Sequence, residues 1–123
     1  MKVLLSIKSE FVEKIFSGEK LFEYRKSIFK REDVTSVVIY ATKPVGKIVG
    51  EFKIKKIHIG SPEVIWQKTH YASGTAERFY FDYFKGKAQA YAIEIGELVK
   101  YDEPINPETM FGKFNAPQSF CYI

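Results

Sequence analysis

Apolar residues recur with the two-residue period of β-strands in several separate segments of the chain. The nearly continuous apolar run Ser36–Thr42 predicts a central strand that is buried on both faces. The other expected strands are Val3–Ile7, Leu21–Lys26, Lys47–Ile59 and Tyr91–Tyr101, with the apolar end of residues 115–123 as a closing edge strand. Pro104 and Pro107 are expected to end the strand before them, because proline cannot donate a hydrogen bond to a neighbouring strand.

The segment Lys47–Ile59 changes phase part-way along. Ile48, Phe52 and Ile54 keep one parity, whereas Ile57 and Ile59 keep the other. Such a slip predicts a β-bulge at Lys55–Lys56, where an extra residue bends the strand. Bulges carry long strands round the corners of small barrels, so the sheet is expected to be curved or closed rather than flat.

Short helices are expected between the strands. Cap signals place them from the N-cap Ser9 to Gly18, from the N-cap Ser61 through Pro62 to about Thr69, and from after Thr75 to Gly86. The last helix carries an aromatic stripe that is expected to be core, made of Phe79, Tyr80, Tyr83 and Phe84. Phe81 falls off this stripe, so it either marks an interaction surface or fills a second packing layer.

Composition bounds the class of protein. The 123 residues are 46% hydrophobic, which predicts one globular domain spanning residues 1–123. The lone Cys121 cannot form an internal disulfide and no Cys/His pair has zinc spacing, so a cytoplasmic protein without a metal site or cofactor is expected. No apolar run approaches the length of a secretion signal or of a membrane helix, which needs about 18 residues.

The positive charge is concentrated in the first half of the chain. Residues 1–62 have a net charge of +6 and residues 63–123 a net charge of −2, within a total of +4. A basic surface attracts polyanions, although scattered lysines also form ordinary solvated faces. Signatures of the commonest enzymes, such as a nucleophile elbow, a P-loop or a dinucleotide-binding turn, are absent from the sequence.

One concentrated polar feature follows the first helix. Gly18, Lys20, Glu23 and Arg25 form the pattern G-x-K-x-x-E-x-R, in which the helix stop is followed by a strand that carries Glu23 and Arg25 on one face. This arrangement can present donors and an acceptor in fixed geometry, with Arg25 lowering and Glu23 raising the pKa of Lys20. Alternatively, Glu23 and Arg25 form a purely structural ion pair that closes the mouth of a barrel.

The pattern resembles the signature of the ASCH domain family, which is related to PUA RNA-binding domains. Further segments support the resemblance in the same order along the chain: Leu4–Lys8, Ile39–Thr42, Val49–Phe52 and Ala116–Phe120. The resemblance implies an α+β fold, a PUA-like small mixed β-barrel of five or six strands with short helices over its openings. It also implies a cleft beside the signature that binds RNA or a nucleotide.

The residues expected to line this cleft come from four parts of the chain. They are Lys8, Lys20, Glu23, Arg25, Tyr40, Lys43, Gln118 and Ser119. Lys20 and Arg25 would contact phosphate or a base edge, and Glu23 would orient Arg25 or accept a hydrogen bond. A base also needs an aromatic platform, for which the candidates are Tyr24, Tyr40, Trp66 and Tyr71.

The resemblance also raises two hydrolase alternatives that would use Lys20. Some small ASCH proteins hydrolyse 4-acetylcytidine with a lysine, a threonine and a glutamate. Here Glu23 stands in the threonine position and the turn 70–74 carries no carboxylate, so two of these three residues are unmatched. Other members are ribonucleases, for which Lys20, Glu23 and Arg25 could supply cationic stabilisation and proton transfer. Binding is therefore preferred to catalysis.

A third class of function is a regulatory or protein-interaction module, such as a transcriptional regulator. In such a protein the signature would be structural only. The expected mark is an exposed aromatic patch around Phe81 or Trp66 together with no affinity for nucleotides.

Overall fold

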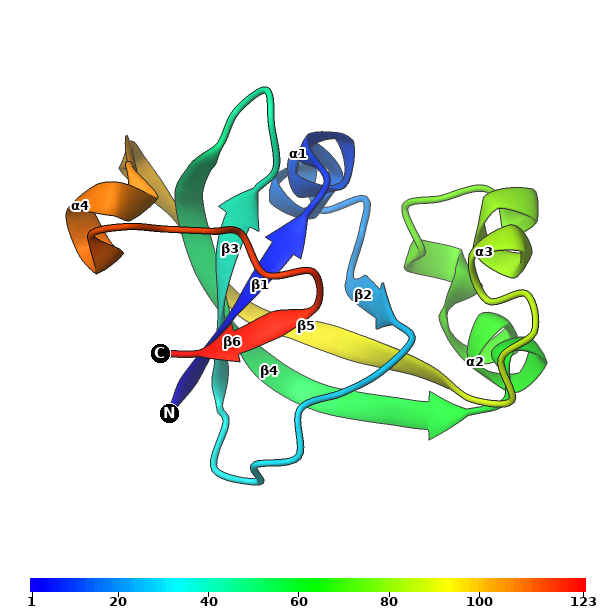
Figure 1. Cartoon of the computed structure of the whole chain (residues 1–123). Helices are drawn as coiled ribbons and strands as arrows, with labels where there is room; N and C mark the ends of the chain where they lie inside the picture. The colour runs from blue at the N-terminus through cyan, green and yellow to red at the C-terminus, as the bar shows by residue number, and fades with distance from the viewer.

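The computed structural model describes all 123 residues and has six strands, four α-helices and one 3-10 turn (Figure 1). In chain order the elements are β1 (Lys2–Ile7), α1 (Ser9–Ser17), β2 (Phe22–Arg25), β3 (Ser36–Ala41), β4 (Lys47–Gly60), α2 (Pro62–Thr69), the 3-10 turn η1 (His70–Ala72), α3 (Glu77–Tyr83), β5 (Ala90–Ile105), α4 (Pro107–Phe111) and β6 (Phe120–Tyr122). None of the helices is long and apolar enough to cross a membrane.

All six strands form one mixed sheet. Their order is β2-β5-β4-β3-β1-β6, with β1 parallel to β3 and every other neighbouring pair antiparallel. The sheet curls into a half-barrel, and its two edges approach each other: Arg25 on β2 donates to the backbone oxygen of Ser119, directly before β6, at 2.7 Å. The expected PUA-like α+β fold is confirmed.

Strands β4 and β5 are much longer than the others and link two parts of the molecule. In Figure 1 they run from the curled sheet beside the termini to the helical pair α2 and α3. Their register shifts three times, once between Ile54 and Lys56. The bulge expected at Lys55–Lys56 is therefore present, and with the other two shifts it bends the ribbon.

Alternating side chains of β1 and β3 enter two different apolar clusters. Leu5 and Ile39 belong to the cluster between the sheet and α1, which also contains Ile15. Leu4 and Val38 belong to the cluster on the opposite face, against which the segment around α4 packs. Every residue of β3 is buried, as expected for a strand covered on both faces. A separate aromatic cluster joins β2 to α2 and α3.

Two expected boundaries differ from the structure. Ser9 is the first residue of α1 rather than its N-cap, because its Oγ donates to the backbone oxygen of Thr42 at 2.9 Å instead of capping the helix. Strand β5 continues through Pro104 to Ile105. Residues 101–104 have no register partner on β4, so the missing N–H of Pro104 breaks no ladder hydrogen bond.

The aromatic stripe of α3 is only partly core. Tyr80 and Phe84 are buried, whereas Phe79 is 41% exposed and Tyr83 is half-buried. Phe81 packs edge-on against Trp66 and Tyr80, with ring centres 6.0 and 5.0 Å apart. Phe81 therefore belongs to a second packing layer, and the exposed side of this helix is the Phe79 side.

Candidate functional site

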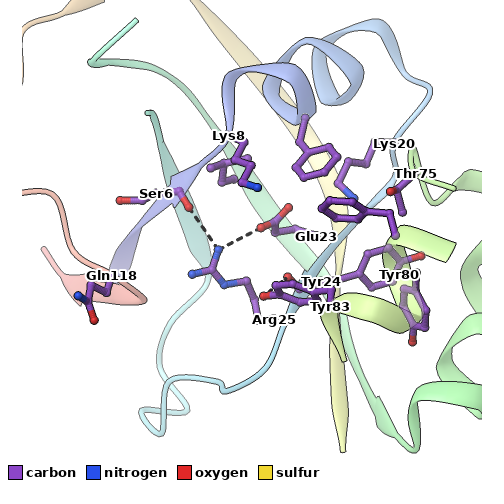
Figure 2. Close-up of a pocket in the computed structure, with 13 residues that line it drawn as sticks. Ser6, Lys8, Lys20, Glu23, Tyr24, Arg25, Thr75, Tyr80, Tyr83 and Gln118 are labelled. Carbon is purple, nitrogen blue, oxygen red and sulfur yellow. Dashed lines mark hydrogen bonds and ion pairs between the residues drawn. The ribbon is translucent and has the colours of Figure 1, made fainter. Parts of the chain in front are cut away.

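A cavity of about 240 Å³ lies where the end of β1, helix α1, strand β2, helix α3 and the C-terminal segment meet (Figure 2). Its wall is formed by thirteen residues: Ser6, Ile7, Lys8, Phe11, Lys20, Glu23, Tyr24, Arg25, Thr75, Phe79, Tyr80, Tyr83 and Gln118. Five of these are aromatic and four are charged. Ligand sites commonly have such a mainly apolar wall with a few placed polar groups.

Lys20 is the buried cation of this cavity, with only 3% of its surface exposed. Helix α1 ends at Gly18, whose φ of 86° suits glycine, and the chain then forms an isolated bridge between Lys20 and Ser73. The Nζ of Lys20 donates to the backbone oxygen of Ser73 at 2.8 Å. It also lies 5.1 Å from the ring centre of Phe11 and 4.6 Å from that of Tyr24.

The surroundings of Lys20 lower the pKa of its ammonium group. Burial lowers the pKa of Lys20 below 10.5, because desolvation disfavours the ammonium group. The Glu23 carboxylate opposes this shift and Lys14 adds to it. Glu23 raises the pKa of Lys20 as expected, whereas the lowering comes from burial and Lys14 rather than from Arg25. Lys20 therefore gives up its proton more readily than an exposed lysine does.

Glu23 and Arg25 form an ion pair on one face of β2. The Nη1 of Arg25 donates to Oε2 of Glu23 at 3.1 Å, and the two side chains are 11% and 7% exposed. Nη1 also donates to the backbone oxygen of Ser6 at 3.3 Å, and Nη2 to that of Ser119 at 2.7 Å. One guanidinium group therefore joins β1, β2 and the segment before β6. The second carboxylate oxygen of Glu23 accepts no hydrogen bond from the protein and remains available to a ligand.

The tyrosines of the wall present their rings to the cavity and bond their hydroxyls elsewhere. The hydroxyl of Thr69 donates to Ile65, so Tyr24 donates its own hydroxyl to Thr69 at 2.8 Å. Tyr80 donates to the backbone oxygen of Pro62, and Tyr83 to that of Tyr24. Burial raises the pKa of Tyr24 to about 12, which keeps it a neutral donor. The aromatic wall is therefore an apolar surface on which a flat ring can stack.

The structure brings five of the eight expected site residues into the cavity wall. They are Lys8, Lys20, Glu23, Arg25 and Gln118. Ser119 is adjacent and contributes its backbone oxygen to Arg25. Tyr40 lies on the opposite face of the sheet, where its ring packs 5.1 Å from that of Phe114. Lys43 lies in the turn after β3, outside the wall.

The expected aromatic platforms are also only partly at the site. Tyr24 lines the cavity. Trp66 packs against Tyr80 with ring centres 4.7 Å apart and does not reach the cavity. Tyr71 is 71% exposed but lies outside the wall, edge-on to Phe22. The sequence reasoning missed Phe11 and Thr75 and assigned Phe79 and Tyr83 to the core. The spacing along α3 could have indicated that Phe79 and Tyr83 line a site. Its four aromatic residues form two adjacent rows, which is more than one buried helix face needs.

Gly74 follows Ser73, the bridge partner of Lys20, and the side chain of Lys20 packs directly against it. Its φ is +67°, and an added Cβ would lie 2.5 Å from Cβ of Lys20. The Gly74→Ala variant is therefore expected to be destabilised by more than about 1 kcal/mol and to displace Lys20. Urea unfolding checks the first effect. Gly86→Ala is the matched control, because Gly86 also has a positive φ but open space around it. Equal losses in both variants would show that only backbone strain matters.

The titratable groups of the cavity do not form a metal site. No three His, Cys, Asp or Glu side chains lie close enough together to hold an ion, and Glu23 is the single carboxylate in the wall. The polar chemistry of the cavity is that of one carboxylate among three cations.

Comparisons with known proteins identify the family. Residues 5–99 match the family model of the ASCH domain. The chain belongs to the ASCH family. A Zymomonas mobilis protein named ASCH domain-containing ribonuclease is 28% identical over 128 residues, which is 99% of this chain and 84% of that protein. The resemblance inferred from the signature at Gly18–Arg25 is therefore confirmed.

Solved structures of ASCH from Zymomonas mobilis show the same fold. One has a TM-score of 0.91 at 27% identity and covers 99% of this chain and 87% of that chain. A point mutant of that protein also has a TM-score of 0.91, at 26% identity, and covers 99% of this chain and 89% of that chain.

The ASCH domain here also matches parts of longer proteins. A Ureaplasma parvum protein named ATP synthase subunit alpha is 30% identical over 122 residues, which is 98% of this chain but 15% of that protein. A Ureaplasma parvum protein named large ribosomal subunit protein uL22 is 31% identical over 90 residues, 73% of this chain and 29% of that protein. The chain thus spans a small part of these relatives and most of the Zymomonas ribonuclease.

Proposed function

We propose that this protein binds RNA and takes one nucleotide into the cavity beside β2. The observation that carries the proposal is the wall of five aromatic rings around Lys20 and Glu23. Stacking of a base on an aromatic ring contributes about 1–3 kcal/mol and is available to every base. Lys20 would donate to the base edge or phosphate, and the free oxygen of Glu23 would accept from an amino or imino group.

The size of the cavity suits one unpaired base, so the sugar and phosphates of the nucleotide would lie at its entrance. Its volume of about 240 Å³ is below the roughly 300–1,000 Å³ that holds a drug-sized molecule. A paired helix cannot deliver a base into such a space unless the base leaves its stack. Unpaired RNA is therefore the expected ligand. The Zymomonas relative is named a ribonuclease, which supports RNA as the chemical class of this ligand.

Binding of single-stranded RNA is expected to depend steeply on salt. If about four phosphates are engaged, the slope of log affinity against log salt concentration should be near −3. Fluorescence anisotropy of a labelled oligoribonucleotide at several salt concentrations measures this slope. Adding a fully paired RNA as competitor tests the preference for unpaired nucleotides. A flat salt dependence would contradict the proposal.

Hydrolysis of RNA is a second candidate. The observation that favours it is the lowered pKa of Lys20 beside the Glu23 carboxylate, since a proton donor and a proton acceptor then face one space. Glu23 would take a proton from the attacking hydroxyl while Lys20 stabilises the charge on phosphate or protonates the leaving oxygen. The acetylcytidine reaction has less support, because the turn 70–75 brings Thr75 but no carboxylate to the cavity.

Turnover separates these functions. Labelled RNA and acetylated cytidine are incubated with the wild type and with Lys20→Met, and products are separated by chromatography. Products that form with the wild type and not with Lys20→Met support the hydrolase. RNA that is bound and recovered intact supports a binding protein, which could act as a regulator by occupying its RNA.

A further inference from the structure

Two exposed lysines hold their ammonium groups over aromatic rings of the cavity wall. The Nζ of Lys8 lies 5.6 Å from the ring centre of Phe79, and the Nζ of Lys26 lies 4.5 Å from that of Tyr83. Neither ammonium group forms an ion pair or a hydrogen bond with the protein. Both charges are therefore free to bind an anion.

The two lysines come from different segments and cover two rings one turn apart on α3. Lys8 follows β1 and precedes α1, whereas Lys26 directly follows β2. In Figure 2, Lys8 and Tyr83 lie on opposite sides of Glu23, and Tyr83 is the ring that Lys26 covers. A ligand beside Glu23 would therefore have a free ammonium group over each of two neighbouring rings of the wall.

The aromatic rings also restrict the conformations of these flexible side chains. An exposed cation over an aromatic face gains about 0.5–1 kcal/mol, which biases the ammonium group toward the entrance. An ion pair would hold the ammonium group but occupy it with a carboxylate, whereas an aromatic ring leaves N–H donors free for phosphate oxygens. The pairs Lys8–Phe79 and Lys26–Tyr83 thus act as two prepositioned phosphate contacts.

We infer that the ligand of the cavity is an internal nucleotide of a single strand, whose 5′ and 3′ phosphates are bound by Lys8 and Lys26. The inference rests on the proposed function, since it takes the cavity to hold a nucleotide. A mononucleotide has one phosphate and can engage only one of the two lysines. A strand that enters on one side and leaves on the other engages both.

A nucleoside 3′,5′-bisphosphate isolates this property, because it carries both phosphates and no further nucleotide. It should compete with a labelled pentaribonucleotide at least about tenfold better than the matching 5′- or 3′-monophosphate. Lys8→Ala or Lys26→Ala should remove that advantage and reduce the salt slope of the pentamer by about 0.7 each. Lys26→Arg should retain the advantage.

Lys47→Ala is the matched control, because Lys47 is an exposed lysine without an ion pair and lies outside the cavity wall. If Lys8→Ala and Lys26→Ala behave like Lys47→Ala, or if a monophosphate competes as well as the bisphosphate, the inference is wrong while nucleotide binding stands. If the wild type binds neither the pentamer nor the bisphosphate, the proposed function fails together with the inference.

Discussion

Replacing Arg25 by methionine is expected to lower the free energy of unfolding by about 3 kcal/mol and Tm by roughly 10 °C. The guanidinium group joins β1, β2 and the segment before β6 through Ser6, Glu23 and Ser119. Its loss would leave the Glu23 carboxylate, whose side chain is 7% exposed, without its cation. Thermal unfolding followed by circular dichroism measures the change.

Removing both charges should be less damaging than removing one. In the double variant Glu23→Gln with Arg25→Met, no buried carboxylate is left unpaired, so about half of the lost stability should return. Arg31→Ala is the surface control, because the Arg31–Asp33 pair is exposed and should leave the unfolding curve unchanged. An Arg25→Met curve that overlays the wild type would show that the sheet edges are held together without this residue.

The curvature of the sheet could be predicted because it is recorded locally in the sequence. A change of parity at Lys55–Lys56 is visible in the sequence, and so is the unbroken apolar run of β3. Helix α4 carried a local signal too, since Asn106 caps the helix and Pro107 opens it. The expectation that Pro107 only ends a strand overlooked this pattern.

The charged residues of the site could be predicted from the sequence, but their contacts with distant segments could not. Glu23 and Arg25 share a face by the period of the strand, so their pairing follows from the sequence. The oxygen of Ser119 is 94 positions from Arg25, and only the curl of the sheet brings them together. Burial of Lys20 likewise depends on the turn at Ser73 and on rings from α1, which no spacing in the signature reveals.

Tyr40 and Lys26 show two ways in which the sequence does not reveal the members of the site. Tyr40 was expected at the site from the family resemblance, yet its position in β3 turns it to the face covered by the α4 segment. Lys26 lies in the basic first half of the sequence, and its place over Tyr83 depends on the docking of α3. Charge clustering along a chain therefore locates a basic surface without saying which cations face one cavity.

Replacing Lys20 by methionine is expected to weaken ligand binding strongly with little loss of stability. A hydrogen bond from a charged donor contributes about 1.5–3 kcal/mol, so affinity should fall by roughly 10- to 100-fold. If the protein hydrolyses RNA, the rate should fall by about 10²–10⁴. Methionine fills a similar volume between Phe11 and Tyr24, so the aromatic wall should remain intact. Anisotropy and urea unfolding measure the two effects separately.

The pH dependence of the stability of the wild type and of Lys20→Met tests whether burial lowers the pKa of Lys20. Because its pKa is lowered in the folded state, the folded protein binds fewer protons than the unfolded chain between the lowered pKa and 10.5. Raising the pH through this interval should therefore stabilise the wild type relative to Lys20→Met. The raised pKa of Tyr24 destabilises both proteins at high pH, so their difference isolates the lysine. A difference that stays constant from neutral pH to 10.5 would mean that Lys20 keeps an ordinary pKa, and proton transfer by Lys20 would lose its support.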